Sequence, residues 1–263
     1  MTHPIAPYQG IAPEDCFFVT NDQMIEMGMG SVTLFYQPEM YPEAPLHIYM
    51  QLDSQPAGRN LLFGALLARA EQLRAQAPNL RGRLFTQIAP EDWDLNGFYT
   101  KAGFKMDDSE DLYHFGLPGW PARAPVNCNY ASVPLKTPQD VQAFLQRMNA
   151  YRITPLDAEF LGRCMGMEHF LAIGYYRGNA VCEALFTGEG QNVTLVSLYV
   201  RADYRRQGFA KAIIGAASDI LRPRGVTQIS TRIYSRNAAQ VALMRAAAGK
   251  KIRSVALLPG ISI

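Results

Sequence analysis

Long apolar runs and a signal sequence are both lacking in this chain of 263 residues. No run approaches the ~18 apolar residues of a membrane-spanning helix, and the N-terminus has neither a basic region nor an apolar region of the secretory kind. The sequence therefore predicts a soluble, cytoplasmic protein that has no membrane partner. The length exceeds the ~150 residues of one average domain, so we expect two domains.

Clustered cysteines and a large net charge are lacking as well. The four cysteines lie far apart, with no Cys-x-x-Cys spacing and no clustering with histidine. This pattern predicts free thiols and no metal site. The net charge is only +2, from 25 Lys and Arg against 23 Asp and Glu, and no basic stripe is visible. The charge pattern thus predicts no nucleic-acid partner.

The most informative motif is a polar turn between an apolar strand, Val193 to Val200, and a helical run at 212–221. The turn has the form Arg-x-x-Gly-x-Ala and reads Arg205, Arg206, Gln207, Gly208, Phe209, Ala210 and Lys211. Glycine and alanine let the main chain approach a ligand, so N–H groups at the helix start converge on an anion. With the basic side chains beside it, the turn predicts a pyrophosphate site.

The segments after this turn extend the pattern. A second apolar strand is expected from Gln228 to Tyr234, and Ser235-Arg236-Asn237 then leads into a helix at 238–248. Gly249 is the expected C-terminal stop of that helix. This order of strand, phosphate turn, helix, strand and Asn-led helix resembles the GNAT superfamily of acyl-CoA N-acyltransferases. The resemblance covers roughly residues 129–263.

The resemblance implies an α/β fold with a mixed sheet and an acyl donor, acetyl-CoA, bound without a metal. It implies that the pyrophosphate lies on the turn 205–211, and that the pantetheine arm pairs with the main chain of Leu198, Tyr199 and Val200. Asn237 would orient CoA, or it simply caps its helix, as Asn often does at this position. The implied activity is N-acetyl transfer to an amine.

The first half of the chain contains a weaker copy of the same order. A strand is expected at 46–52, a helix at 61–75, a strand at 83–89 and a helix at 92–102. Aligning Gln55 with Arg205 also aligns Gly58 with Gly208. The last helix ends in Tyr99 before a Gly-Phe pair, which again resembles the GNAT family. We therefore predict two GNAT-like units in tandem, with two unrelated α/β halves as the alternative.

The first copy is expected to be degenerate. Pro56 removes one N–H from its anion turn, and Asn60 stands where the second turn has a small residue. In the second copy the turn is intact, but Met244 occupies the place of the tyrosine found in the family. The first half thus has a predicted structural or substrate-shaping role.

The boundary between the halves is expected in the proline-rich segment 118–126, which holds three prolines and one glycine. This predicts an abbreviated domain at 1–118, a linker at 119–127 and the acetyl-CoA domain at 128–263. After the linker we expect a strand at 130–135, a helix starting at Thr137 and Pro138, and a helix at 155–165. Two strands, at 170–176 and 180–187, complete the approach to the cofactor strand.

Glu183 is the predicted general base, since the cofactor strand carries Val196 and Ser197 where some GNAT members have glutamate. Apolar neighbours around Glu183 favour burial, which would raise its pKa, with a water relaying the proton. An outward-facing strand glutamate is the alternative and, on pattern alone, the favoured one. A dedicated base is also dispensable where a neutral fraction of the amine suffices.

The acid that protonates the leaving thiolate is predicted to be Tyr234, with Tyr199 as a second candidate and simple packing as the alternative for both. Tyr99 would serve only if the halves docked suitably. The acidic run 107–111 either attracts a cationic amine or forms a solvated hairpin turn, the favoured interpretation.

The leading functional hypothesis is an acetyl-CoA-dependent N-acyltransferase acting on a small amine or an amino-acid-like acceptor in a ternary complex. The alternative is a non-catalytic module that binds CoA or acyl-CoA. The expected partners are a CoA thioester and a small amine, and a homodimer is one of the oligomeric states that the sequence permits.

Overall fold

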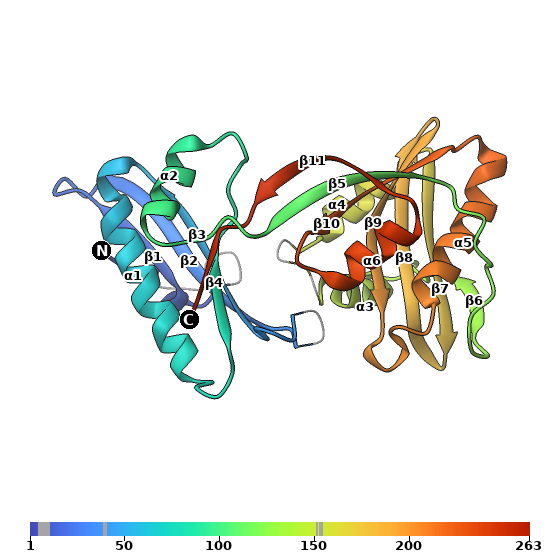
Figure 1. Ribbon diagram of the computed structural model, residues 1–263, viewed down its shortest axis with the longest axis horizontal. Coiled ribbons are helices and arrows are strands. Elements are labelled where there is room, and N and C mark those ends of the chain that lie inside the picture. The colour runs from blue at the N-terminus through green and yellow to red at the C-terminus, as the bar shows by residue number, and fades with distance from the viewer. Residues whose placement is uncertain (5–10, 39–40, 151, 153–154) are drawn as a thin grey trace. The chain divides into compact units, whose positions relative to one another are not determined.

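The computed structural model describes residues 1–4, 11–38, 41–150, 152 and 155–263 (Figure 1). Packing divides the chain into two units, which we call unit 1 and unit 2. Unit 1 comprises Met1–Glu110, Ser235–Asn237 and Ser254–Ile263. Unit 2 comprises Asp111–Tyr234 and Ala238–Arg253. Unit 1 therefore combines segments that are distant in sequence.

Unit 1 is built on a mixed sheet with the strand order β1-β2-β3-β4-β12. The bounds are β1 Cys16–Thr20, β2 Glu26–Tyr36, β3 Leu46–Ser54, β4 Gly82–Phe85 and β12 Gly260–Ser262. Helix α1 (Pro56–Ala75) buries Leu62 and Leu66 against this sheet, and a short helix, α2 (Trp93–Lys101), follows β4. A 3-10 turn, Pro13–Asp15, precedes β1.

Unit 2 is built on a second mixed sheet with the order β11-β5-β10-β9-β8-β7-β6. Its strands are β5 Ser109–Gly116, β6 Asn129–Ser132, β7 His169–Arg177, β8 Asn179–Glu189, β9 Asn192–Val200, β10 Gln228–Tyr234 and β11 Lys250–Leu257. Its helices are α3 Pro138–Asn149, α4 Ala158–Met165, α5 Phe209–Leu221 and α6 Ala238–Ala246, with 3-10 turns at Ala202–Tyr204 and Arg222–Arg224.

Two hydrophobic clusters cover the sheet of unit 2. Helix α5 is buried on almost every side and packs Ile213, Ala217 and Leu221 against one cluster. Helices α3 and α4 contribute Phe144 and Leu161 to another. Because α5 is enclosed by apolar contacts, its N-terminal turn is held rigidly relative to the strand before it.

Helix termini in unit 2 follow the local signals in the sequence. Thr137 caps α3 and forms a capping box with Asp140, and Pro138 occupies the first turn, as predicted. The predicted strand from Gln228 to Tyr234 has the same bounds in the structure. The helix expected from residue 155 begins only at Ala158, because Asp157 accepts a hydrogen bond from the Phe160 N–H and caps it.

One strand in unit 1 is shorter than predicted. We expected a strand at 83–89, but β4 ends at Phe85. Beyond it, the Thr86 and Ile88 N–H groups donate to the carbonyls of Pro259 and Leu257. The C-terminal segment thus takes over the backbone partners that an extended β4 would need.

Each sheet contains a strand whose neighbours in the sheet are distant from it in sequence. Strand β12, the last of the chain, pairs antiparallel with β4 of unit 1. Strand β5, which precedes the proline-rich segment, lies between β10 and β11 in the sheet of unit 2. The structure is thus mixed α/β with two mixed sheets, and both sheets use distant segments.

The proline-rich segment packs on unit 2. Trp120, Ala122 and Val126 contact its core, and a Cβ on Gly215 of α5 would meet the Trp120 carbonyl oxygen at 2.4 Å. This close approach explains why α5 has glycine there. The linker at 119–127 and the domain bounds 1–118 and 128–263 stay predictions about the folding units.

Candidate active site

The parallel strands β9 and β10 separate halfway along their length. Their register runs from Asn192↔Gln228 to Leu195↔Thr231 and ends there, although both strands continue. The part of β9 from Val196 to Val200 therefore keeps a main-chain edge that β10 does not cover. An extended ligand can pair with such an edge as an added strand.

Antiparallel pairing with β8 decides which main-chain groups face this open edge. The Arg201 N–H donates to the Val181 carbonyl at 2.9 Å. Hydrogen-bonded and non-hydrogen-bonded pairs alternate along an antiparallel ladder. The next pair, Val200 with Cys182, and the pair Leu198 with Ala184 are therefore not hydrogen-bonded to each other. The N–H groups of Val200 and Leu198 thus point away from β8.

Two of the three residues predicted to bind pantetheine thus present main-chain N–H groups to the open edge. Tyr199 lies opposite Glu183 and turns its side chain towards the cluster formed with α3 and α4. The same alternation directs the Tyr199 N–H towards β8.

A β-bulge lies at the point where β9 leaves β10. The register with β8 shifts between Leu185 and Phe186, so that Val196 is the extra residue. Its carbonyl accepts a hydrogen bond of 3.0 Å from Arg152 Nη1. Bulges re-aim a strand, and this one bends the cofactor strand at the start of its open edge.

The turn at 205–211 has the backbone of an anion-binding turn. Arg206 has φ 60° and Gly208 has φ 92°, and Gly208 is the N-cap of α5. Where residues with negative and positive φ follow one another, their N–H groups point to the same side of the chain. Within the described residues, no hydrogen bond is recorded for the backbone N–H groups of Arg206 to Lys211.

Side chains around this turn are partly fixed and partly open. Arg205 Nε donates to the Val200 carbonyl at 3.1 Å, and Gln207 Nε2 donates to the Asp203 carbonyl at 2.8 Å. Phe209 is buried in the core. Arg206 and Lys211 are exposed, and Lys211 Nζ lies 5.6 Å from the centre of the Trp120 ring. The turn thus combines a fixed backbone with exposed positive charge.

Glu183 of β8 is fully buried, with 0% of its surface exposed. Its carboxylate receives Arg147 Nε at 2.7 Å, Arg147 Nη2 at 2.9 Å and the Tyr176 hydroxyl at 2.9 Å. The interpretation of Glu183 as an outward-facing strand residue is therefore wrong. Burial and the charge of Glu183 together raise the pKa of Tyr176.

The predicted acid and its neighbours lie at the far end of β10. Tyr234 is half-buried, and its N–H donates to the Gln240 side chain at 2.8 Å. Asn237 is fully buried directly before α6. Met244 is buried in the core of unit 2. Its thioether has no proton to donate.

Tyr99 belongs to the core of unit 1. It packs against Phe63, Phe98 and Phe104 and hydrogen-bonds Thr86. Burial raises the pKa of Tyr99 to about 12. Its side chain is thus enclosed by its own unit.

In unit 1, β3 also continues past its pairing with a parallel neighbour, although here β4 itself ends at that point. The parallel register of β3 and β4 ends at Tyr49↔Phe85. A cavity of about 320 Å³ lies nearby, lined by Tyr49, Gln87, Ile88, Ala89, Val255 and Ala256. The helix that follows, α1, begins with Pro56 and has no side-chain cap, and Arg59 beside it is paired with Asp94 at 2.6 Å.

The acidic run 107–111 differs from the sequence prediction. Asp108 and Asp111 are buried, and Lys251 Nζ lies 2.7 Å from Asp111. The interpretation as a solvated hairpin turn is therefore wrong, because these carboxylates meet cations and main-chain donors that are distant in sequence. Asp107 is the more exposed member and pairs with Arg83 and Arg236.

Arg147 and Tyr176 contact the predicted base, and Arg152 contacts the cofactor strand; sequence reasoning missed all three. No motif marks them, and Arg147 lies 36 positions before its partner Glu183. The one usable signal was the apolar sequence around Glu183, because a carboxylate that is buried among such residues needs a nearby cation.

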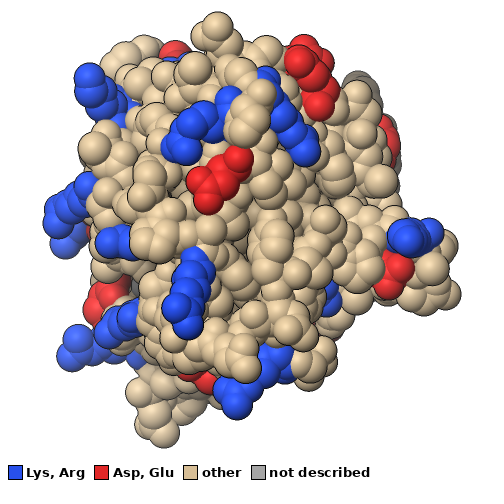
Figure 2. Space-filling model, turned by 90° about the vertical axis from the view of Figure 1, so that its right-hand side faces the viewer, with Lys and Arg blue, Asp and Glu red and all other residues tan. Residues whose placement is uncertain are grey.

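No group of three or more His, Cys, Asp or Glu side chains that could hold a metal ion occurs among the described residues. None of the helices in the described part of the chain is both long and apolar enough to cross a bilayer. On the face shown in Figure 2, Lys and Arg are separated by uncharged residues, with Asp and Glu among them.

Comparison with known proteins agrees with this geometry. The family model described as the acetyltransferase (GNAT) family matches residues 132–249, which include the open edge of β9, the turn and Asn237. No curated protein matches the chain.

Solved structures show the fold of nearly the whole chain. A GCN5-related N-acetyltransferase from Sphaerobacter thermophilus aligns with a TM-score of 0.50 at 17% identity, covering 97% of this chain and 82% of that one. A probable N-acyltransferase from Enterococcus faecalis V583 aligns with a TM-score of 0.53 at 14% identity, covering 93% and 61%.

A third structure, Eis1 from Mycobacterium abscessus, aligns with a TM-score of 0.52 at 11% identity, covering 90% of this chain and 62% of that one. The chain thus spans less than two thirds of the last two proteins. These likenesses concern the fold, and two units in tandem are consistent with their coverage. Residues 132–249 thus match the model of the acetyltransferase (GNAT) family, and the solved structures show a fold of the same kind.

Proposed function

We propose that the protein is an acyl-CoA-dependent N-acyltransferase that transfers an acyl group, in the first place acetyl, to a primary amine of a small or amino-acid-like acceptor. The observation that carries the proposal is the continuous main-chain surface from the open edge of β9 to the turn at 205–211. It offers N–H groups of Leu198 and Val200 and then those of Arg206 to Lys211. An extended arm that ends in a diphosphate matches this order.

The reaction is a direct attack in a ternary complex. The amine nitrogen attacks the thioester carbonyl carbon, a C–N bond forms, and the C–S bond breaks. A main-chain N–H on the edge of β9 stabilises the negative charge on the carbonyl oxygen. The cofactor-binding set is Leu198, Tyr199, Val200, Arg205, Arg206, Gln207, Gly208, Phe209, Ala210, Lys211 and Asn237.

Two protons must move for this reaction to balance. Glu183 is proposed to take the amine proton through a water, and Tyr234 is proposed to donate a proton to the CoA thiolate. The ion pair with Arg147 fixes the position of the Glu183 carboxylate. No metal is assigned to the reaction.

A second candidate function is a CoA-binding module without turnover. The buried Met244, which stands where the family has a tyrosine, favours it. The partners and the cytoplasmic location predicted from the sequence stay predictions.

Calorimetry with acetyl-CoA, followed by thiol release across a panel of primary amines, tests both candidates on the full chain. Binding with thiol release for at least one amine supports the enzyme. Binding without release for any acceptor supports the module. Absence of CoA binding refutes both.

A further inference from the structure

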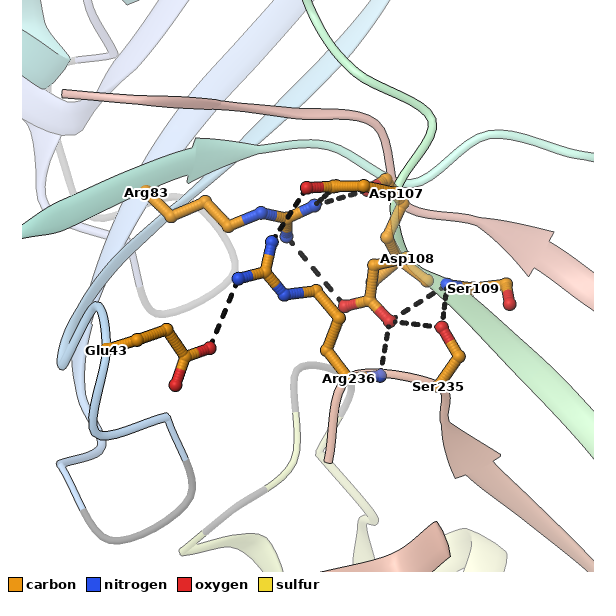
Figure 3. A network of polar contacts seen from close by, with 8 residues as sticks. Glu43, Arg83, Asp107, Asp108, Ser109, Ser235 and Arg236 are labelled. Atoms are coloured by element: carbon orange, nitrogen blue, oxygen red, sulfur yellow. Dashed lines mark hydrogen bonds and ion pairs between the residues drawn. The ribbon is translucent and has the colours of Figure 1, made fainter. Parts of the chain in front are cut away.

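A buried carboxylate, Asp108, fixes the segment that links β10 to α6 (Figure 3). Its Oδ1 accepts hydrogen bonds from the Ser235 hydroxyl at 2.8 Å and from the Arg236 backbone N–H at 3.0 Å. The same oxygen accepts the Ser109 N–H at 2.9 Å. A single carboxylate oxygen therefore joins the start of β5 to residues that lie more than a hundred positions later in the sequence.

Ser109 and Ser235 are also joined directly by hydrogen bonds of their main-chain groups. The Ser235 N–H donates to the Ser109 carbonyl at 2.8 Å, and the Ser109 N–H also reaches the Ser235 hydroxyl at 3.0 Å. Ser235 is thus held through its N–H and its hydroxyl, and Arg236 through its N–H. This leaves the main chain of the segment with one well-defined course.

An outer layer of ion pairs surrounds the junction. The Arg236 guanidinium contacts Asp107 at 2.8 Å and Glu43 at 3.1 Å, and Arg83 contacts Asp107 at 2.7 Å. Asp107 and Glu43 are 40% and 50% exposed, so water reaches both carboxylates, although Arg83, one partner of Asp107, is itself buried.

Asp108 differs from this outer layer because its side chain is only 2% exposed. Loss of a buried, charged acceptor costs its partners more than loss of an exposed one. Asp108 is therefore the member of the cluster on which the course of the segment depends.

The position of this segment in the chain gives the junction a functional meaning. Residues Ser235–Asn237 pack with unit 1, whereas β10 before them and α6 after them belong to unit 2. The anchored pair Ser235 and Arg236 stands between Tyr234, the proposed acid, and Asn237, the proposed CoA contact. We propose that Asp108 is a positioning residue for acyl transfer, through which the first half of the chain fixes Tyr234 and Asn237.

This inference rests on the proposed function. Reacting groups tolerate little displacement, and an error of about 1 Å costs roughly a hundredfold in rate. Asp108 touches neither the acyl donor nor the acceptor in this proposal. Asp108 contributes by fixing the main chain of Ser235 and Arg236, and thereby the positions of the residues on each side of them.

The test compares Asp108→Asn with Asp107→Asn in the full chain. Both variants remove one negative charge from the same cluster, but only Asp108→Asn replaces the buried carboxylate oxygen that accepts three hydrogen bonds with an amide oxygen, which is a weaker acceptor. Asp108→Asn is expected to lower kcat/KM for acetyl-CoA by about tenfold or more, and Asp107→Asn to stay within about twofold. Equal effects of the two variants, or no effect of Asp108→Asn, would overturn the proposal.

A double-mutant cycle and hydrogen exchange separate positioning from general destabilisation. Ser235→Ala is expected to lower kcat/KM by about threefold alone, and by less than about twofold when added to Asp108→Asn. Exchange of the Arg236 amide should become faster in Asp108→Asn and not in Asp107→Asn. Additive kinetic effects with unchanged amide exchange would contradict a shared junction.

Two further outcomes are covered by the same design. If Asp108→Asn does not fold, Ser235→Ala alone carries the test, and unaltered kcat/KM with unaltered Arg236 exchange overturns the proposal. If the wild-type protein neither binds nor turns over acetyl-CoA, the proposed function fails and this inference fails with it. An active wild type with an unaffected Asp108→Asn removes the positioning role alone.

Discussion

Arg147 and Glu183 form a two-pronged ion pair between α3 and β8, with nitrogen–oxygen distances of 2.7 and 2.9 Å. The carboxylate is fully buried, while the side chain of Arg147 is 29% exposed. A buried charge needs both its partner and its hydrogen bonds. This pair therefore ties α3 to the strand that precedes the cofactor strand.

Removing Arg147 should be costly for the fold. Arg147→Ala leaves the Glu183 charge buried without a cation, and we expect the free energy of unfolding to fall by about 3–5 kcal/mol. Urea denaturation monitored by circular dichroism measures this change. The matched control is Arg163→Ala, since Arg163 and its partner Glu159 are both exposed, and there we expect less than about 1 kcal/mol. If the free energy of unfolding fell equally in the two variants, the buried pair would stabilise the fold no more than the exposed pair.

Neutralising Glu183 tests its proposed chemistry. Glu183→Gln keeps the shape but removes the base, so kcat should fall by about a hundredfold near pH 7. The deficit should shrink as the pH approaches the pKa of the amine, because more of the acceptor is then already neutral. A pH profile of kcat measures this, with Glu189→Gln at the exposed end of the same strand as the control. A kcat equal to wild type across the profile would leave Glu183 with a structural role only.

Gly208 is the position at which a side chain should most directly harm CoA binding. Its φ of 92° is one that L residues rarely adopt, and an added Cβ would stand 3.5 Å from Pro125 Cγ. Gly208→Val should reshape the turn and abolish CoA binding measured by calorimetry. Gly225→Val is the matched control, since Gly225 has φ 83° and open space around it.

Both glycine variants should lose about 1–3 kcal/mol of stability through backbone strain. Only Gly208→Val should lose the ligand. Retained CoA affinity in Gly208→Val would place the diphosphate elsewhere and sink the proposed site.

His47 should make the stability of the protein depend on pH. Burial, together with the positive charges of Arg83 and Arg236, lowers the pKa of His47 from 6.5 to about 4. A lowered pKa means that the folded state binds the proton less well than the unfolded chain. The stability that neutral His47 contributes is therefore present above about pH 6.5 and lost as the pH falls towards 4.

The expected loss across this range is roughly 3 kcal/mol. Urea denaturation at several pH values measures how the free energy of unfolding changes with pH. This change should be smaller for His47→Gln than for wild type. Asp108, whose pKa burial raises despite its hydrogen bonds, changes stability in the opposite direction. Because Asp108 is present in both proteins, it cancels in the comparison, and identical slopes would contradict the prediction for His47.

Local sequence signals predicted the second half of the chain well. Thr137 and Pro138 mark the start of α3, Gly208 precedes α5, and the bounds of β10 are those expected. These features depend on capping side chains and on which residue tolerates a positive φ. Such preferences act over a few neighbouring residues, so a single sequence reveals them.

Partnerships between distant segments were not predictable in the same way. Arg147 is one of many arginines, and only the packing of α3 places it beside Glu183. The acidic run resembled a solvated turn because its cations, Arg83, Arg236 and Lys251, lie far away in the chain. Charge pairing in the interior depends on the fold and leaves no spacing rule in the sequence.

By itself, the sequence determined the order of strands and helices from β6 to α6, the place of the turn at 205–211 and its likeness to the GNAT family. The tertiary structure decided that β5 inserts between β10 and β11 and that β12 completes the sheet of unit 1. It also decided that Asp108 holds the chain after Tyr234. The physical reason is that helix and turn formation is governed by neighbouring residues, whereas any strand of suitable pattern can pair with an open edge, and only the packing of the whole chain selects which one does.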